Sequence, residues 1–375
     1  MVILKKLGSC LLIFLEDYFI VYNEEETSQK IVQVPGPQVD PEVSKSMEEV
    51  LKPENKIITS VCTSRDAEFL TIILQNRQLV IYDSNFNLVS NILSKRAVSK
   101  AMFTKHNDVL IADKTGDVYL YKFKDKSEPT LLLGHLSMLL DITMSACGKY
   151  VITCDRDEKI RVSCYPNAYN IVSYCLGHKE FVSHVVISND VLISASGDGT
   201  IRFWDFLNGT EISMLNTNDY VDNKSVVEKF RKEMDAEKVA IDALPIVDIQ
   251  VFGNIIAVTL LGYHGIQLYC VNKCNEQVNI KFLQNLKITP EILTFTLNHE
   301  LLIFTETSLL KYKYDKDRFV EATSISINEL FANYKVSSCN EILNINSKIS
   351  ALYKRKFDNV QEYLERKKLR LENKI

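Results

Sequence analysis

Two successive copies of one pattern constrain the fold of this chain more than any other feature. The first copy begins at Gly134 and reads GHLSMLLDITMSACGKYVITCDRDEKIRVSCYP, and the second begins at Gly177 and reads GHKEFVSHVVISNDVLISASGDGTIRFWDFLNG. Each copy opens with Gly-His, passes through an apolar strand, reaches a tight turn that contains Asp, and ends in another strand. The two openings lie 43 residues apart, within the period of roughly 40–45 residues of a four-stranded propeller blade. We therefore expect a β-propeller.

The second copy holds the polar side chains of a complete WD-type blade. His178, Ser194, Asp198 and Trp204 stand where such blades place a buried hydrogen-bonded tetrad. An imidazole, a hydroxyl, a carboxylate and an indole N–H can satisfy one another there, and each is costly to bury alone. The GDGT turn at 197–200 supplies glycine where a positive φ is needed. This copy predicts a structural tetrad.

The first copy departs from this pattern at one position. Thr153 and Asp157 align with Ser194 and Asp198 at a constant offset of 41 residues, but a serine, Ser163, stands where the tryptophan belongs. We therefore expect an incomplete tetrad in the first copy, with Asp157 as its carboxylate.

Related strand–turn–strand units continue on both sides of these copies. We count seven units in all, over about 4–34, 56–93, 97–132, 134–176, 177–215, 244–285 and 290–322. Because the first and last are short, we expect the N-terminal strand to complete the last blade and so to close the ring. The predicted fold class is all-β: a seven-bladed WD40 β-propeller over residues 1–325, followed by a basic, partly helical C-terminal tail over residues 326–375.

Three segments stand apart from the repeat. The proline-rich stretch 34–56 is expected to be a surface loop, and the charged stretch 217–242 a short helix, as tolerated insertions or as partner contacts. The N-terminal run LGSCLLIFL follows two lysines as in a signal peptide, but Glu16 and Asp17 come next instead of a cleavage site. We predict two strands around a Glu-Asp turn there.

Charge is distributed unevenly along the chain. The net charge is −4, yet residues 351–375 carry eight Lys/Arg and four Asp/Glu, which leaves 36 basic and 44 acidic residues elsewhere. Such a tail is a solvated helix, a nuclear-import signal or an RNA contact. The candidate residues for import or RNA contact are Lys354, Arg355, Lys356, Arg366, Lys367 and Lys368. The expected location is the nucleus, with the cytoplasm as a second compartment.

Motifs for catalysis are missing from the sequence. It has no glycine-rich phosphate loop, no GxSxG, no HExxH and no cysteine with a base at motif spacing. The nine cysteines follow no framework, so we expect reduced thiols in an intracellular protein and no metal site. No apolar run reaches transmembrane length. We predict a non-catalytic protein without a cofactor of its own and without a membrane partner.

The order of segments across 131–215 is more specific than a WD signature. DRDEKIR followed by GHKEFVS closely resembles the WD-repeat non-catalytic subunits of tRNA (guanine-N7) methyltransferase, the Wuho family, and the tail sequence KRKFDNVQEYLERKK is similar to the basic tail of that family. A general WD adaptor, such as a substrate receptor of a ubiquitin ligase, is the alternative. Such an adaptor has no reason to carry DRDEKIR–GHKEFVS.

The resemblance implies a function by association. In that family the propeller binds and stabilises a separate catalytic subunit, forming a heterodimer that uses S-adenosylmethionine to methylate N7 of a guanine in the tRNA variable loop. The cofactor is thus expected on the partner, and tRNA is met mainly through the complex. The family's partner-binding motif falls here on Asp157, Glu158 and Arg161. An alternative for Arg161 is a salt bridge within its own blade.

Overall fold

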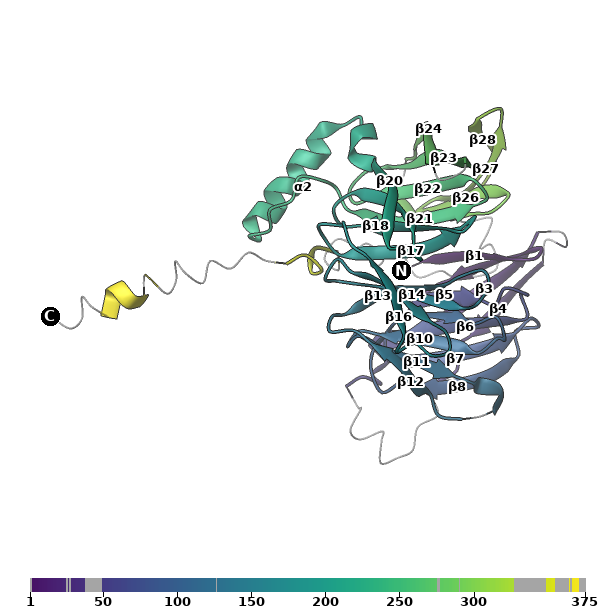
Figure 1. Ribbon diagram of the computed structural model, residues 1–375. Coiled ribbons are helices and arrows are strands. Elements are labelled where there is room, and N and C mark those ends of the chain that lie inside the picture. The colour runs from purple at the N-terminus through teal and green to yellow at the C-terminus, as the bar shows by residue number, and fades with distance from the viewer. Residues whose placement is uncertain are drawn as a thin grey trace.

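Seven four-stranded antiparallel sheets follow one another along the chain in this computed structural model (Figure 1). The structure describes residues 2–24, 26, 28–37, 49–125, 127–274, 277–289, 291–326, 349–354, 364 and 366–370. In every sheet, each strand pairs with the next strand in sequence. The prediction of an all-β, seven-bladed WD40 propeller is therefore confirmed.

The first four blades occupy the N-terminal half of the chain. Blade 1 holds β1 (Ile3–Leu7), β2 (Cys10–Phe14), β3 (Tyr18–Asn23) and β4 (Ser28–Gln33). Blade 2 holds β5 (Ile58–Thr63), β6 (Phe69–Leu74), β7 (Gln78–Asp83) and β8 (Leu88–Leu93). Blade 3 holds β9 (Val98–Phe103), β10 (Val109–Asp113), β11 (Asp117–Tyr121) and β12 (Thr130–Gly134). Blade 4 holds β13 (Leu139–Met144), β14 (Tyr150–Asp155), β15 (Ile160–Cys164) and β16 (Ile171–Cys175).

Three further blades complete the ring. Blade 5 holds β17 (Val182–Ser188), β18 (Val191–Ser196), β19 (Thr200–Asp205) and β20 (Thr210–Asn216). Blade 6 holds β21 (Ile246–Phe252), β22 (Ile255–Leu260), β23 (Gly265–Cys274) and β24 (Gln277–Lys287). Blade 7 holds β25 (Ile292–Leu297), β26 (Glu300–Thr305), β27 (Ser308–Asp315) and β28 (Arg318–Ser326).

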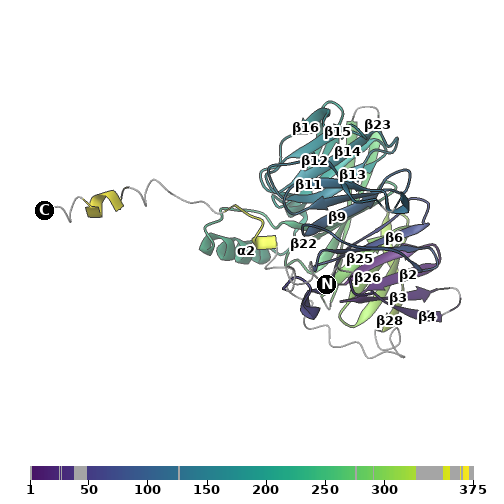
Figure 2. The same ribbon diagram turned by 90° about the horizontal axis from the view of Figure 1, so that it is seen from below.

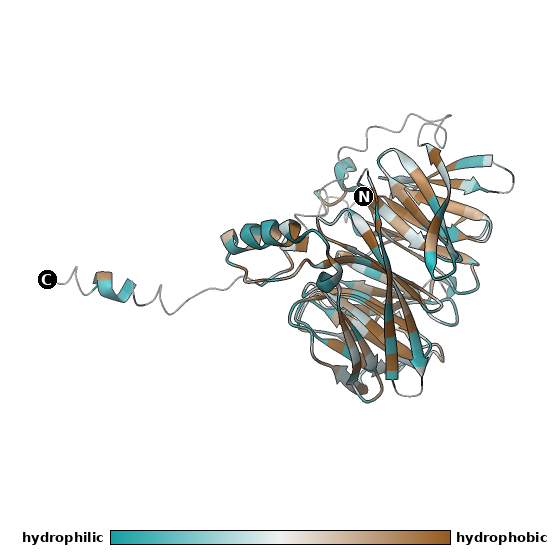
Figure 3. Cartoon of the chain, turned by 90° about the horizontal axis from the view of Figure 1, so that it is seen from above, coloured by the Kyte–Doolittle hydropathy of each residue, from teal (hydrophilic) through white to brown (hydrophobic). Residues whose placement is uncertain are grey.

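The second strand of each blade lies between neighbouring sheets. Residues of β10 and β18 are buried along their whole length, as expected for a strand that is covered on both faces. Both strands consist mostly of apolar residues, VLIAD in β10 and VLISAS in β18. Figure 3 shows hydrophobic residues, in brown, along many strands of the propeller. The outer strands β8 and β16 are instead exposed or half-buried along most of their length.

The ring closes differently from the expectation. We predicted that the N-terminal strand would complete the last blade, but β1 pairs with β2, and β28 pairs with β27. Blades 1 and 7 instead share a buried cluster in which Leu4 and Ile13 of blade 1 meet Leu302 and Phe304 of blade 7. The seventh unit has its own four strands, because the chain after Tyr314 turns back and forms β28. Side-chain packing therefore closes the ring.

The predicted helix between blades 5 and 6 is present. Helix α2 (Lys224–Ala236) begins after Asn223, whose side chain accepts a hydrogen bond from the N–H of Ser225, a common N-cap. Phe230 and Met234 are its buried residues. Elsewhere, the described residues form three short 3-10 helices: η1 (Pro53–Asn55), η2 (Phe123–Asp125) and η3 (Thr217–Tyr220). The first of them lies in the described part of the predicted loop 34–56.

Segment 349–354 returns to the propeller beside α2 (Figures 1 and 2). Within it, Tyr353 is buried, and Ile349 and Leu352 pack against the cluster that includes residues of blades 5 and 6. Near the C-terminus, residue 364 and residues 366–370 are helical.

Two further predictions concern the cysteines and the N-terminal run. The described residues include seven free cysteines: Cys10, Cys62, Cys147, Cys154, Cys164, Cys175 and Cys270. The N-terminal run forms β2 and β3 around a turn at Glu16 and Asp17, as predicted. Across the described residues, no helix is both long enough and apolar enough to span a membrane.

Candidate functional site: the face of blades 4 and 5

The tetrad of blade 5 is assembled as the sequence indicates. His178 Nδ1 lies 3.1 Å from Asp198 Oδ2, and His178 Nε2 lies 2.7 Å from Ser194 Oγ. Trp204 Nε1 donates to the same Ser194 Oγ over 2.8 Å. Because Ser194 Oγ accepts from the indole, its own hydrogen is free to point at Nε2, which leaves the imidazole proton on Nδ1 for Asp198. Gly199 in the following turn has a φ of +74°, as expected for its GDGT motif.

The Asp198 carboxylate is held in its charged form. Its burial would raise its pKa, but hydrogen bonds from His178, from Thr200 and from the N–H of Lys179 outweigh the burial and lower the pKa. All four tetrad side chains thus form hydrogen bonds within the blade, and the tetrad stabilises the packing of its strands.

Blade 4 uses a different carboxylate from the one that we predicted. His135 Nδ1 contacts Asp155 Oδ2 at 3.0 Å, and His135 Nε2 contacts Thr153 Oγ1 at 2.8 Å. Asp155 stands at the end of β14, at the pairing position that Ser196 occupies in blade 5. From that position the Asp155 carboxylate hydrogen-bonds to His135 Nδ1, so Asp155 is the tetrad carboxylate of blade 4. The prediction that Asp157 fills this role is wrong. Asp157 is left at the surface.

The turn between β14 and β15 is acidic and partly exposed. Asp157 and Glu158 follow Arg156 in this turn, and Glu158 has a φ of +64°. Lys354 Nζ lies 3.3 Å from Asp157 Oδ1 and 2.7 Å from Glu158 Oε1. Burial would raise the pKa of Asp157, but the hydrogen bond and the charge of Lys354 outweigh this effect and lower it. We call Asp157, Glu158 and their backbone the acidic turn.

Arg161 points into the propeller and away from the acidic turn. Its Nη1 donates to the carbonyl of Gly134 over 2.9 Å, and its Nε donates to Ser163 Oγ over 3.1 Å. Only 8% of the residue is exposed. The equivalent residue of blade 5, Arg202, instead forms a salt bridge with Glu211. In its described contacts Arg161 therefore ties blade 4 to the end of blade 3, and these contacts include no salt bridge within its own blade.

The basic tail is described only in part. Lys354 binds the acidic turn, and Arg366, Lys367 and Lys368 are exposed in the helical residues 366–370. The other two candidates, Arg355 and Lys356, lie outside the described residues. Sequence reasoning missed the docking of segment 349–354, although one signal was available: Ile349, Leu352 and Tyr353 are apolar residues directly before the basic run.

The described residues also line hollows elsewhere in the propeller, among them one large and one small. A cavity of about 600 Å³ is lined by the inner strands of several blades, with Lys100, His184 and Asp248 among its residues. His184 Nε2 lies 3.7 Å from Asp248 Oδ1 there, and burial lowers the pKa of His184 although Asp248 opposes that shift. Among the described residues, no three His, Cys, Asp or Glu side chains are grouped so that they could hold a metal ion.

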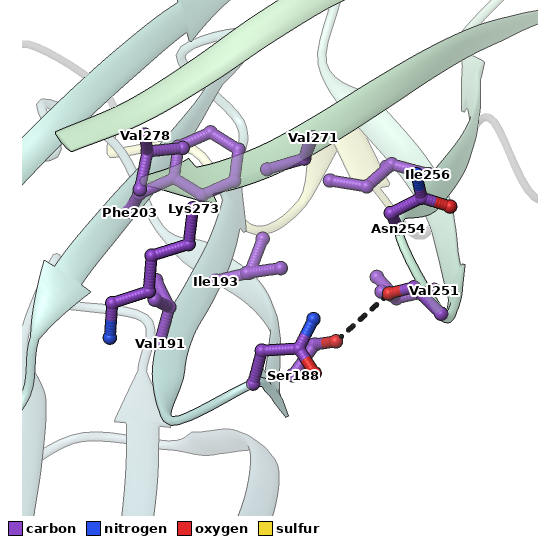
Figure 4. Close-up of a pocket in the computed structure, with 12 residues that line it drawn as sticks. Ser188, Val191, Ile193, Phe203, Val251, Asn254, Ile256, Val271, Lys273 and Val278 are labelled. Carbon is purple, nitrogen blue, oxygen red and sulfur yellow. Dashed lines mark hydrogen bonds between the residues drawn. The ribbon is translucent and has the colours of Figure 1, made fainter. Parts of the chain in front are cut away.

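The second hollow lies between blades 5 and 6 (Figure 4). It measures about 20 Å³, which is room for about one water molecule. Half of its lining residues are valine or isoleucine, and Ser188 Oγ donates to the carbonyl of Gly253 across its edge over 3.1 Å. A space of this size is a packing defect between blades.

Fold and tetrad together define the class of this protein as a WD-repeat β-propeller. A chain in the crystal structure of a mitotic checkpoint complex has a TM-score of 0.61 at 14% identity, over 82% of this chain and 88% of that chain. The structure of U3-55K gives 0.59 at 12% identity, over 79% and 84%. Identities this low show the fold alone.

Sequence comparisons identify the family. A family model for the tRNA methyltransferase TRM82 WD40 domain matches residues 121–310. The tRNA (guanine-N(7)-)-methyltransferase non-catalytic subunit wdr4 of Xenopus laevis is 32% identical over 336 residues, which cover 84% of this chain and 81% of the relative. The non-catalytic subunit wuho of Culex quinquefasciatus is 28% identical over 337 residues, or 85% and 77%. The chain belongs to this family of non-catalytic subunits, as its DRDEKIR–GHKEFVS segment indicated.

Proposed function

We propose that this chain binds and stabilises the catalytic subunit of a tRNA (guanine-N7) methyltransferase. The two subunits form a heterodimer that makes N7-methylguanine in the tRNA variable loop. S-adenosylmethionine binds to the catalytic partner, and tRNA is met mainly through the complex. The observation that carries this proposal is membership of a family whose relatives are named as non-catalytic subunits of this enzyme. The basic tail supports a nuclear location with a cytoplasmic pool.

The acidic turn is the surface that we propose for the catalytic subunit. Asp157 and Glu158 project from a hairpin that is held from behind, because Asp155 Oδ1 accepts the N–H groups of Asp157 and Lys159 over 2.8 and 3.1 Å. A rigid turn that presents two carboxylates suits a basic patch on a partner. Arg161, the third residue of the motif, is proposed to act by fixing this blade against blade 3.

Charge reversal of the acidic turn tests the proposal. In D157K/E158K, the catalytic subunit should bind at least about tenfold more weakly, because like charges replace a complementary pair at an interface. The thermal unfolding of the isolated chain should change little, since both side chains are partly exposed. Binding is measured by titration of the purified catalytic subunit, and product by transfer of label from S-adenosylmethionine to tRNA.

Two controls accompany this experiment. Lys281→Met removes an exposed ion pair with Asp317, far along the chain from the turn, and should leave binding unchanged. The isolated chain should transfer no label to tRNA above background. Label transfer by the isolated chain, or a catalytic subunit that neither binds it nor gains activity from it, would contradict the proposal.

A further inference from the structure

The carboxylates of the acidic turn are already occupied by a cation from the same chain. Lys354 lies 196 residues beyond Glu158 in sequence, and its Nζ contacts both carboxylates. This contact depends on the docking of segment 349–354, which lies beside α2 on one side of the propeller (Figures 1 and 2).

Tyr353 anchors that segment. Its hydroxyl donates to the carbonyl of Gly197 over 2.7 Å, and its ring packs edge-on against Phe181 with centroids 5.0 Å apart. The centroid of the Phe230 ring, from α2, lies 6.4 Å from the centroid of the Tyr353 ring. Tyr353 is only 2% exposed. Gly197 permits this packing, because a Cβ there would come within 2.4 Å of the Phe181 ring.

Arg156 fixes the direction in which the segment continues. Its Nε donates to the carbonyl of Leu352 over 2.8 Å, and its Nη2 donates to the carbonyl of Tyr353 over 3.3 Å. Arg156 directly precedes the acidic turn, so the backbone of Tyr353 is tied to that turn. The next residue, Lys354, is thereby delivered to the two carboxylates.

The two contacts of the segment differ in how readily they exchange. Undocking Tyr353 would expose the apolar surface that its ring now buries, which costs free energy. The side chain of Lys354, in contrast, is 49% exposed, and ion pairs that exposed contribute little to stability and are screened by salt. Lys354 can therefore leave the carboxylates while Tyr353 stays in place.

We propose that Lys354 is a built-in competitor for the acidic turn, which a basic side chain of the catalytic subunit must displace in order to bind. The inference rests on the proposed function, because it assigns a regulation to the same surface. The ligand class is a lysine or arginine on the partner. The anchored segment keeps the Lys354 ammonium at a high effective concentration near the acidic turn. The ammonium therefore weakens the binding of the catalytic subunit and favours its release. Because binding of the partner exchanges one ion pair for another, the affinity of the wild-type chain for the catalytic subunit should rise little as the salt concentration is lowered.

Substitution of Lys354 by methionine in the full chain tests this competition. K354M keeps an unbranched side chain but removes the charge, so it should bind the purified catalytic subunit about three- to fivefold more tightly at low salt. The affinities of variant and wild type should converge as salt rises, because the new ion pair of the variant is screened. Lys281→Met is the matched control, because it removes an exposed cation from an ion pair with Asp317, and it should leave affinity and salt dependence unchanged.

A second pair of variants separates this inference from the proposed function. In a D157N/E158Q background, which itself should bind more weakly, K354M should have no further effect. Weaker binding by D157N/E158Q, together with a K354M affinity equal to or below wild type, would overturn the competition and leave the acidic turn as the partner surface. Absence of binding by every variant and by the wild type would overturn the proposed function and this inference with it.

Discussion

At the scale of single residues, two neighbouring blades solve the same problem with different side chains. In each blade a buried histidine needs a hydroxyl on one ring nitrogen and a carboxylate on the other. Blade 5 takes its carboxylate from the turn, at Asp198, whereas blade 4 takes it from the strand end, at Asp155. The consequence is functional as well as structural, since of these two blades only blade 4 keeps its turn carboxylates outside the tetrad, where they contact Lys354.

Replacement of Trp204 by alanine should destabilise the protein by about 3–5 kcal/mol, as for other buried aromatic residues. The side chain is 1% exposed, and its Nε1 donates to Ser194 Oγ. Trp204→Phe keeps most of the packing but removes the indole donor, so it should cost about 1–3 kcal/mol. Urea unfolding of both variants against wild type gives these differences. A Trp204→Ala midpoint equal to wild type would contradict the assignment of the tetrad.

The Asp198 carboxylate should make the free energy of unfolding depend on pH in the acidic range. Its pKa in the folded chain lies below the ordinary value of about 3.9, so the folded state favours the charged form more than the unfolded state does. Its contribution to the free energy of unfolding is therefore complete above about pH 4 and is lost as the pH falls through the folded pKa. In Asp198→Asn, unfolding free energy measured from pH 6 down to pH 2 should fall less steeply than in wild type. Parallel profiles would refute the linkage.

At the scale of elements, the β14–β15 hairpin connects three parts of the molecule. Arg161 ties its second strand to the end of β12, Arg156 ties its turn to segment 349–354, and Lys354 covers its carboxylates. A surface turn fixed at so many points has little freedom, which lowers the entropy cost of presenting it to a partner. Its sequence is thus constrained on both its buried and exposed sides.

Charge reversal of Arg161 should reduce stability as well as partner binding. A carboxylate at this buried position would face the carbonyl of Gly134, and a loss of about 2 kcal/mol or more follows from orphaned and repelling polar groups. Arg161→Met should cost about 1–3 kcal/mol. Arg202→Met should cost less, because the hydrogen bond from Arg202 to Glu211 is exposed whereas those of Arg161 are buried or half-buried. Urea unfolding is the measurement. If Arg161→Glu melts as wild type and only loses the catalytic subunit, the arginine acts at the interface itself.

At the scale of the whole molecule, the propeller is a ring of seven sheets that are each continuous in sequence. The first and last blades do not share a strand; they are joined by the buried cluster that contains Leu4 and Phe304. The resulting platform carries its insertion α2 and segment 349–354 together on one side. Tyr353 is packed near Phe230 of α2, and the next residue, Lys354, contacts Asp157, so segment 349–354 links the helix to the acidic turn.

The sequence by itself determined the architecture and the family. The period of 43 residues, the GDGT turn and the order of His178, Ser194, Asp198 and Trp204 are local patterns, and each has one main structural solution. The helix in 217–242 was also predictable from its charged pattern, and DRDEKIR–GHKEFVS was enough to indicate the family.

Only the tertiary structure decided which carboxylate meets His135, where Arg161 points, how the ring closes and what lies on the acidic turn. The first two depend on distances of a few ångströms between strands, which an alignment at a constant offset does not measure. The closure depends on whether a fourth strand forms after Tyr314, and Lys354 reaches Glu158 across 196 residues of sequence. Contacts between residues so far apart along the chain cannot be recognised from the sequence repeat, because they depend on where the folded blades place their turns.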